Sequence, residues 1–270
     1  MREHVPFEFP AGYDGTAVFE RLAQVLDPEL DESILDLGFV RSLQLRSGNA
    51  EIAVQLPTSW CAVNFAYLMA EDIRRALLAV DGVDRVTVRL GDHCAAEQIE
   101  AAVNDGRPFA EAFPGEGAGS LAALRLTFLR KGFLGRQQRL LQELREAGCS
   151  PAFICGLRLG DVSMQDEAIM IRRPPGAAPD AAGSAPVLRR YLQRRGELSL
   201  DCSLSAPLII DLEGKPLSAE RLAAHYEAAR TVRVAMEANG SFCRAMLNIR
   251  RLDAEPASDN KDVGGRNVQA

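Results

Sequence analysis

The residue best placed to do chemistry in this sequence is Cys61, which lies where an alternating pattern gives way to a helical one. Apolar and polar residues alternate up to Leu56, as in a half-buried strand, and apolar residues then recur every three to four positions from Ala62 to Val80. We therefore expect Cys61 at a strand-to-helix turn, in the first turn of the helix. Unpaired N–H groups and the helix dipole favour the thiolate there, the form that binds soft metals and attacks electrophiles. A buried, inert cysteine is the alternative.

Two further soft donors, His93 and Cys94, follow the next predicted strand. If that strand brings them near Cys61, they could supplement it as metal ligands. The alternative is that Asp92 caps the following helix and that the Cys94 side chain is simply packed against neighbouring residues. A third interpretation makes His93 the base for a nucleophilic Cys61, although the sequence offers no third group to orient the pair.

An acidic turn precedes these elements. The first predicted helix must end at Asp27-Pro28-Glu29, because proline disfavours helical geometry in the residue before it. A compact apolar corner follows and closes at Gly38, which can take a positive φ. The carboxylates of this region, Asp36 included, are hard oxygen ligands that suit soft-metal chemistry poorly. We expect them mainly to cap helices and to fix the corner.

The predicted elements of the first half come in the order helix, hairpin, helix, strand, which is typical of a small α+β domain. Their ranges are 16–26, 39–46 with 50–56, 61–80 and 86–90, with a further helix at 95–104. The second half is mostly helical. Its predicted helices are 121–131, 135–147, 186–195 and 219–239, with one possible strand at 167–172 and a Pro/Gly/Ala-rich run at 173–185. We expect an α+β domain over residues 1–115, a helical domain over 116–252 and a disordered tail over 253–270.

Composition limits the class of protein. A chain of 270 residues with 47% hydrophobic residues can bury the cores of two ordinary domains. The six cysteines form no CxxC pair and no dense framework, so they predict separate thiols in a reducing compartment. No apolar run approaches the roughly 20 residues that span a bilayer, and the first residues lack the order of a signal peptide. These features predict a cytoplasmic protein.

Charge is divided unevenly along the chain. Residues 1–115 carry 9 Lys/Arg against 19 Asp/Glu, a net charge of −10, whereas the remaining 155 residues carry 22 against 18, a net charge of +4. The basic residues of the second half are nearly all arginines, many of them in doublets such as Arg189-Arg190 and Arg194-Arg195. Such doublets could meet nucleic acid, an acidic partner or the acidic N-terminal half, although solvated helix faces are the commoner explanation.

Four separated pieces of the first half match one family in order. They are Val25-Leu26-Asp27-Pro28-Glu29-Leu30, then Ile34-Leu35-Asp36-Leu37-Gly38-Phe39-Val40, then Thr58 with Cys61, then Asp81-Gly82-Val83 before a strand. Over roughly Ala17 to Leu90 the chain resembles the iron–sulfur cluster assembly family, which includes cytosolic iron–sulfur assembly targeting subunits and oxygenase maturation proteins of PaaD and SufT type. The resemblance implies that Cys61 is the family's single reactive cysteine and Thr58 the threonine before it. It makes Asp27, Glu29 and Asp36 the acidic corner.

The chain departs from that family around the cysteine. Where the family usually has Pro-Gly before the cysteine and proline after it, this chain has Ser59-Trp60 and Ala62, which alters the loop and the exposure of the thiol. The segment from Gly106 to Gly115 looks like the linker of family members found beside bacterial diiron monooxygenase genes. The resemblance thus ranks an oxygenase among the possible clients.

The second half resembles, weakly, the catalytic domain of tyrosine recombinases in residues 157–162 and 214–218. The chemistry does not carry over. Ser150 stands where the first catalytic arginine would fall, and only Arg244 lies near the second. Tyr191 and Tyr226 both come too early to be the nucleophile. This half is therefore interpreted as a non-catalytic, helical interaction domain.

Together these features predict a maturation factor and carrier, not an enzyme, that assembles or delivers iron or a transient iron–sulfur cluster. Cys61 and Thr58 would bind the cluster, with His93 and Cys94 as additional metal ligands. One thiolate cannot complete the usual four-cysteine coordination of a cluster, so a second copy of the chain, a client metalloprotein or a small thiol would share it. We expect the assembly machinery as a partner, and neither a membrane nor nucleic acid. The alternatives are a DNA-binding protein related to recombinases and a thiol-dependent enzyme.

Overall fold

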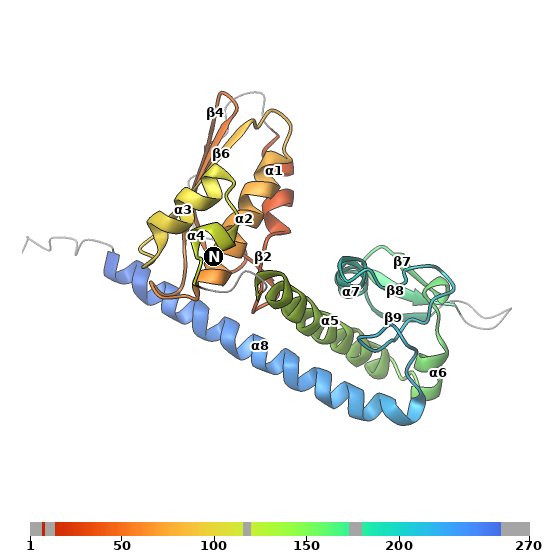
Figure 1. The fold of residues 1–270 in the computed structure, drawn as a ribbon. Helices are drawn as coiled ribbons and strands as arrows, with labels where there is room; N and C mark the ends of the chain where they lie inside the picture. Colours follow the sequence, from red (N-terminus) through yellow and green to blue (C-terminus); the bar gives the residue numbers. More distant parts are fainter. Residues whose placement is uncertain (1–6, 9–13, 116–119, 173–179, 255–270) are drawn as a thin grey trace, which may run out of the picture.

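The computed structural model describes residues 7–8, 14–115, 120–172 and 180–254. A small sheet with its helices forms the N-terminal unit, residues 7–8 and 14–115, and a largely helical C-terminal region, residues 120–254, follows it (Figure 1). The predicted α+β class, with a mostly helical second part, is confirmed. The N-terminal elements are β1 (Phe7–Glu8), α1 (Gly15–Ala23), β2 (Leu26–Asp27), β3 (Glu32–Ser33), β4 (Val40–Arg46), β5 (Asn49–Gln55), α2 (Val63–Leu78), β6 (Arg85–Gly91), α3 (Ala96–Asp105) and α4 (Phe109–Ala112).

The main sheet has the strand order β1-β4-β5-β6. Strands β4 and β5 form the predicted antiparallel hairpin, and β6 lies parallel to β5, with Gly91 opposite Gln55. The short strand β1 pairs in parallel with β4. Because β5 and β6 run in the same direction, the residues that follow each of them meet at one edge of the sheet.

The core of the N-terminal unit lies between this sheet and helices α1, α2 and α3. Fully buried residues alternate along β5, as in Ile52 and Val54, and recur with helical spacing along α2, as in Ile73 and Leu77. The segment that resembles a linker also packs here, because α4 buries Phe109 and Phe113 follows it, stacked on Phe109 with ring centroids 5.0 Å apart.

Helix α5 (Ser120–Glu146) is continuous, so the prediction of two separate helices here is wrong. The expected break falls at two glycines, Gly132 and Gly135. A Cβ on Gly132 would lie 2.9 Å from the carboxylate of Asp31, and one on Gly135 would lie 3.8 Å from the Cβ of Arg233 on another helix. The glycines therefore allow close approach of other segments to α5 instead of ending it.

The C-terminal region contains more strand than predicted. The three-stranded sheet β7-β8-β9 packs beside α5 and α7, and only β8 corresponds to a predicted strand. The tail was predicted to begin at residue 253, and its residues 255–270 lie outside the described residues. Residues 173–179 of the Pro/Gly/Ala-rich run also lie outside them. The remaining elements are α6 (Pro151–Gly156), η1 (Leu159–Asp161), β7 (Val162–Gln165), β8 (Ala168–Ile171), β9 (Asp180–Ser184), α7 (Ala185–Glu197) and α8 (Ala219–Ala254).

Helix α8 runs alongside α5 and then beneath the N-terminal unit (Figure 1). The prediction that it ends near Asn239 is wrong, because its inner face continues through Leu247. Leu222 near its start belongs to the core of the C-terminal region, whereas Leu247 belongs to the core of the N-terminal unit. One helix thus joins both cores. Across the described part of the chain, no helix combines the length and apolar character that crossing a membrane requires.

Candidate functional site

Cys61 lies in the loop between β5 and α2. Helix α2 begins at Val63 with Ala62 as its N-cap, so Cys61 precedes the helix and the prediction that it lies in the first turn is wrong by two residues. The thiol is half-buried and packs against the core of the N-terminal unit, whereas the neighbouring Trp60 side chain is 75% exposed. Cys61 therefore lies at the surface of this core, with part of the residue exposed to solvent.

Thr58 and Cys61 are in direct contact. The Thr58 hydroxyl lies 3.2 Å from the Cys61 sulfur, and either atom can donate the proton. When the hydroxyl donates, the hydrogen bond stabilises the thiolate, the form that ligates a metal.

His93 holds the backbone of this loop. Its ring is buried, with Nε2 2.8 Å from the Cys61 carbonyl oxygen, and the Ala95 N–H donates to Nδ1 at 3.1 Å. Because Nδ1 accepts, Nε2 carries the proton and donates to the carbonyl. Both ring nitrogens are engaged with the backbone, and neither is hydrogen-bonded to the Cys61 sulfur. The structure thus brings His93 to Cys61 in a positioning role.

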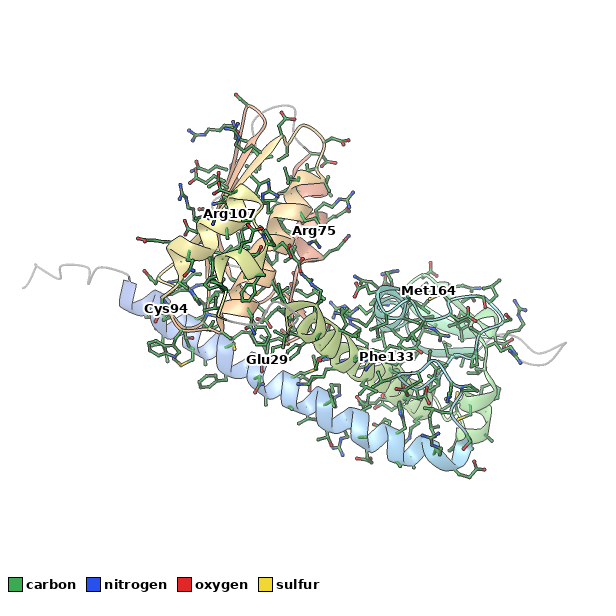
Figure 2. The ribbon with its side chains drawn as sticks, in the orientation of Figure 1. Glu29, Arg75, Cys94, Arg107, Phe133 and Met164 are labelled. Carbon is green, nitrogen blue, oxygen red and sulfur yellow. The ribbon has the colours of Figure 1, made fainter. Side chains whose placement is uncertain are left out.

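Cys94 also contacts the loop through its backbone. Its N–H donates to the Ser59 carbonyl at 2.7 Å, while its side chain is exposed. Figure 2 shows Cys94 at the end of the N-terminal unit beside α8. Within the described ranges, no three His, Cys, Asp or Glu side chains form a group that could hold a metal ion. The predicted trio of Cys61, His93 and Cys94 is not such a group.

Hydrogen bonds within the acidic corner hold its shape. The Asp27 carboxylate accepts from the N–H groups of Glu29 at 2.9 Å and Leu30 at 3.0 Å, which fixes the turn through Pro28. Gly38 has φ +74°, and a Cβ there would lie 3.2 Å from the Arg251 guanidinium. Asp36 is exposed.

Desolvation by burial raises the pKa of Asp27 to about 6. The two backbone N–H groups lower this pKa, and the charges of Glu29 and Glu32 raise it. When Asp27 is ionised, the acidic corner therefore carries several negative charges close together.

The C-terminal part of α8 covers the same edge of the N-terminal unit, which sequence reasoning missed. Arg250 donates to the Leu56 carbonyl at 2.7 Å, and Arg251 donates to the Gly38 carbonyl. Both acceptors belong to the segments that frame Cys61 and the corner. One signal in the sequence indicates this docking, a helical series that continues beyond the predicted end. Its members are Met236, Gly240, Cys243 and Leu247.

Three further contacts complete the docking of α8. Asn239 donates to Glu29 at 3.3 Å, Arg244 pairs with Glu32 at 2.5 Å, and Arg250 pairs with Asp92 at 3.5 Å. In Figure 2 the labelled Glu29 lies near α8, whereas Arg75 and Arg107 lie away from it. Arg244, which lies in sequence near the position of the second catalytic arginine of recombinases, is thus part of this interface.

Several arginines of the C-terminal region pair within the protein. The buried side chains of Arg136 and Arg194 both bind Asp31, with Arg136 Nε at 2.6 Å. Arg125 pairs with Asp72 at 2.7 Å. Of the three partners considered for the arginines, the acidic N-terminal half is therefore the one that these residues contact.

Arg195 and Tyr191 are fully buried. The Arg195 guanidinium donates to backbone carbonyls, including Pro207 at 2.9 Å, and the Tyr191 hydroxyl donates to Leu208 at 2.7 Å. Burial also raises the pKa of Tyr191, so this hydroxyl is a structural group.

Comparison with known proteins gives one family match. No curated protein matches the chain, and the resemblance of the C-terminal region to tyrosine recombinases stays a prediction. Residues 16–89, which contain Thr58, Cys61 and the acidic corner, match the model of the family described as iron–sulfur cluster assembly protein, and this match supports a general role in iron–sulfur cluster assembly.

Proposed function

We propose that this protein carries iron or an iron–sulfur cluster on Cys61 and delivers it to a client metalloprotein. The observation that carries the proposal is the position of Cys61 within the matched segment, where its sulfur is half-buried and in contact with the Thr58 hydroxyl. A half-buried thiol is shielded on one side and open to an incoming partner on the other. This combination suits a carrier better than a permanent site.

The small number of donors supports transfer over storage. A cluster in proteins is normally held by four cysteines, and the described residues contain no group of three donors around Cys61. The remaining coordination would come from sulfide, a small thiol, a second copy of the chain or the client. A cargo held by few protein ligands leaves readily when a client offers more of them.

The client would be an oxygenase or another metalloprotein that receives iron in the cytoplasm. The oxygenase proposal rests on the likeness of residues 106–115 to the linkers of monooxygenase-associated proteins. In this chain the segment packs into the core through Phe109 and Phe113. Residues 106–115 would therefore support the site mechanically, and other surfaces would bind the client.

The two alternative functions receive less support from the site. A thiol-dependent enzyme would need a base at the Cys61 sulfur, whereas His93 bonds to the Cys61 carbonyl. A recombinase-like DNA-binding protein could use the exposed Arg189 and Arg190, but Arg194 and Arg195 of the same helix are buried and bonded internally. The carrier function needs a partly exposed thiol and no base at its sulfur, and Cys61 meets this description.

Anaerobic reconstitution tests the proposal. The wild-type chain, Cys61→Ser and the control Cys202→Ser are incubated with ferrous iron, sulfide and a thiol, then desalted. We expect the wild type and Cys202→Ser to retain iron, sulfide and visible absorption, and Cys61→Ser to lose them. Cys202 is an exposed thiol of the C-terminal region, so it controls for nonspecific binding. Transfer to an apo-ferredoxin then tests delivery, and a Cys61→Ser chain that loads and transfers like the wild type contradicts the proposal.

A further inference from the structure

A second thiol, Cys243, reaches the candidate site from the opposite end of the sequence. It lies on α8 one helical turn from Asn239, which binds Glu29, and one turn from Leu247, which is buried in the N-terminal core. Residues four apart share a helix face. Cys243 therefore points toward the N-terminal unit and packs, half-buried, against the same core as Cys61.

The surroundings of Cys243 are acidic. The groups close enough to interact with its thiol electrostatically include Asp27, Glu29 and Cys61. Arg244 is among these groups as well, although this arginine is already paired with Glu32. The carboxylates of Asp27 and Glu29 attract a cation, and a bound cation favours the thiolate form of a cysteine beside it.

We propose that Cys243 is a second soft ligand for the metal cargo at Cys61, supplied by α8. This inference rests on the proposed function and goes beyond the single cysteine that the family resemblance implies. A divalent metal ion that binds both thiols forms two metal–sulfur bonds and releases two protons to solvent. The other coordination positions stay with sulfide, a small thiol or the client.

The attachment of α8 explains how a residue so far along the chain can act here. Arg250 and Arg251 bond to the carbonyls of Leu56 and Gly38, which frame the Cys61 loop and the corner. These bonds fix the rotation of the helix, and Leu247 fixes its depth. The face that bears Cys243 is thus held against the site by contacts on both sides of it.

Anaerobic titration with cobalt(II) tests the proposal, because bonds from thiolate to cobalt give a charge-transfer absorption that grows with the number of thiolates. Four reduced chains are compared, the wild type, Cys61→Ser, Cys243→Ser and Cys155→Ser. Cys155 is a matched control, since its thiol is also half-buried. We expect Cys155→Ser to behave as wild type. Cys61→Ser and Cys243→Ser should each lose about half of the absorption per cobalt and bind about tenfold more weakly or worse.

A trivalent arsenical provides a measurement that does not depend on metal binding or on correct folding of a variant. Phenylarsine oxide condenses with two neighbouring thiols, forming two arsenic–sulfur bonds and releasing one water. In the wild-type chain we expect one arsenic to link the peptides of Cys61 and Cys243, as seen by mass spectrometry after digestion. Reaction at separate single thiols would overturn the proposal.

The outcomes separate this inference from the proposed function. If Cys243→Ser binds cobalt as the wild type does while Cys61→Ser does not, Cys243 is no ligand and the carrier function of Cys61 stands. If Cys61→Ser also binds as the wild type does, the proposed function fails as well. Loss of the signal in both variants, with the arsenic link present in the wild type, supports both.

Discussion

The Asp31 carboxylate accepts two hydrogen bonds from the Arg136 guanidinium, at 2.6 and 2.9 Å, across 105 residues of sequence. Arg194 binds the same carboxylate. One largely buried acid of the N-terminal unit therefore pairs with two buried arginines of the C-terminal region, and Glu197, 2.7 Å from Arg194, supplies a second negative charge. The close approach depends on Gly132, which leaves room for the carboxylate against α5.

The first prediction concerns this ion pair. Asp31→Asn should lower the free energy of unfolding by about 3–5 kcal/mol, because it leaves the buried Arg136 guanidinium without its carboxylate partner, whereas Arg194 keeps Glu197. Asparagine tolerates the left-handed backbone of this residue, φ 55°, so the change tests charge alone. Urea unfolding measures the effect, with the exposed Asp36→Asn as control. Equal stability of the two variants would contradict the prediction.

The second prediction concerns His93 as a positioning residue. His93→Ala should reduce the iron retained after reconstitution and weaken cobalt binding by about tenfold, as loss of an outer-shell partner does. His93→Gln should recover part of the binding, because its amide can donate to the Cys61 carbonyl. The rate of Cys61 alkylation should change in parallel. If alanine and glutamine variants bind equally, the hydrogen bond to Cys61 does not position the thiol.

The third prediction concerns pH. The pKa of Asp27 is about 6 in the folded chain, above its ordinary value of 3.8. The folded state therefore binds more protons than the unfolded state between these values, and stability falls as pH rises from about 4 through 6. We expect Asp27→Asn, which keeps the acceptor for the Glu29 and Leu30 N–H groups, to remove about 1–3 kcal/mol of this decline. Urea unfolding at pH 4, 5 and 8 measures it, and an unchanged pH profile would contradict the assignment.

The fourth prediction concerns the docking of α8. Leu247→Ala should destabilise the protein by about 2–5 kcal/mol, because it opens a cavity in the N-terminal core. It should also speed alkylation of Cys243 and proteolysis of the last turns of α8. Leu252→Ala on the same helix is the control, since Leu252 is 71% exposed. Similar protease sensitivity of the two variants would show that Leu247 does not anchor the helix.

Local sequence patterns predicted the strand, the helix and the loop that carry the candidate site. The alternation that ends at Leu56 and the helical spacing that follows it located β5, α2 and the loop with Cys61, because each depends on neighbours in sequence. The predicted order of elements agrees with the structure, and the family match to residues 16–89 covers the segment in which the resemblance was predicted. The error of two residues at the start of α2 arose because Ala62, an N-cap without a side-chain hydrogen bond, leaves no capping signal in the sequence.

Contacts between segments that are far apart in sequence could not be predicted from such local patterns. Gly132 and Gly135 read as breaks in a helix, because the segments that pack against them, at Asp31 and Arg233, lie far away in sequence. For the same reason the range 1–115 expected for the α+β domain did not include Leu247, which belongs to its core. That Cys243 packs against the same core as Cys61 became visible only after α8 had been placed.

Because α8 is anchored in one core at Leu222 and in the other at Leu247, it is also a lever. The 25 residues between these anchors span about 37 Å at 1.5 Å per residue, so a tilt of one degree about Leu222 moves Leu247 by about 0.7 Å. A metal–sulfur bond tolerates departures of only about 0.2 Å. At the proposed site, a partner that tilts the C-terminal region strongly enough to loosen these anchors would therefore change how closely Cys243 approaches Cys61, without touching either thiol.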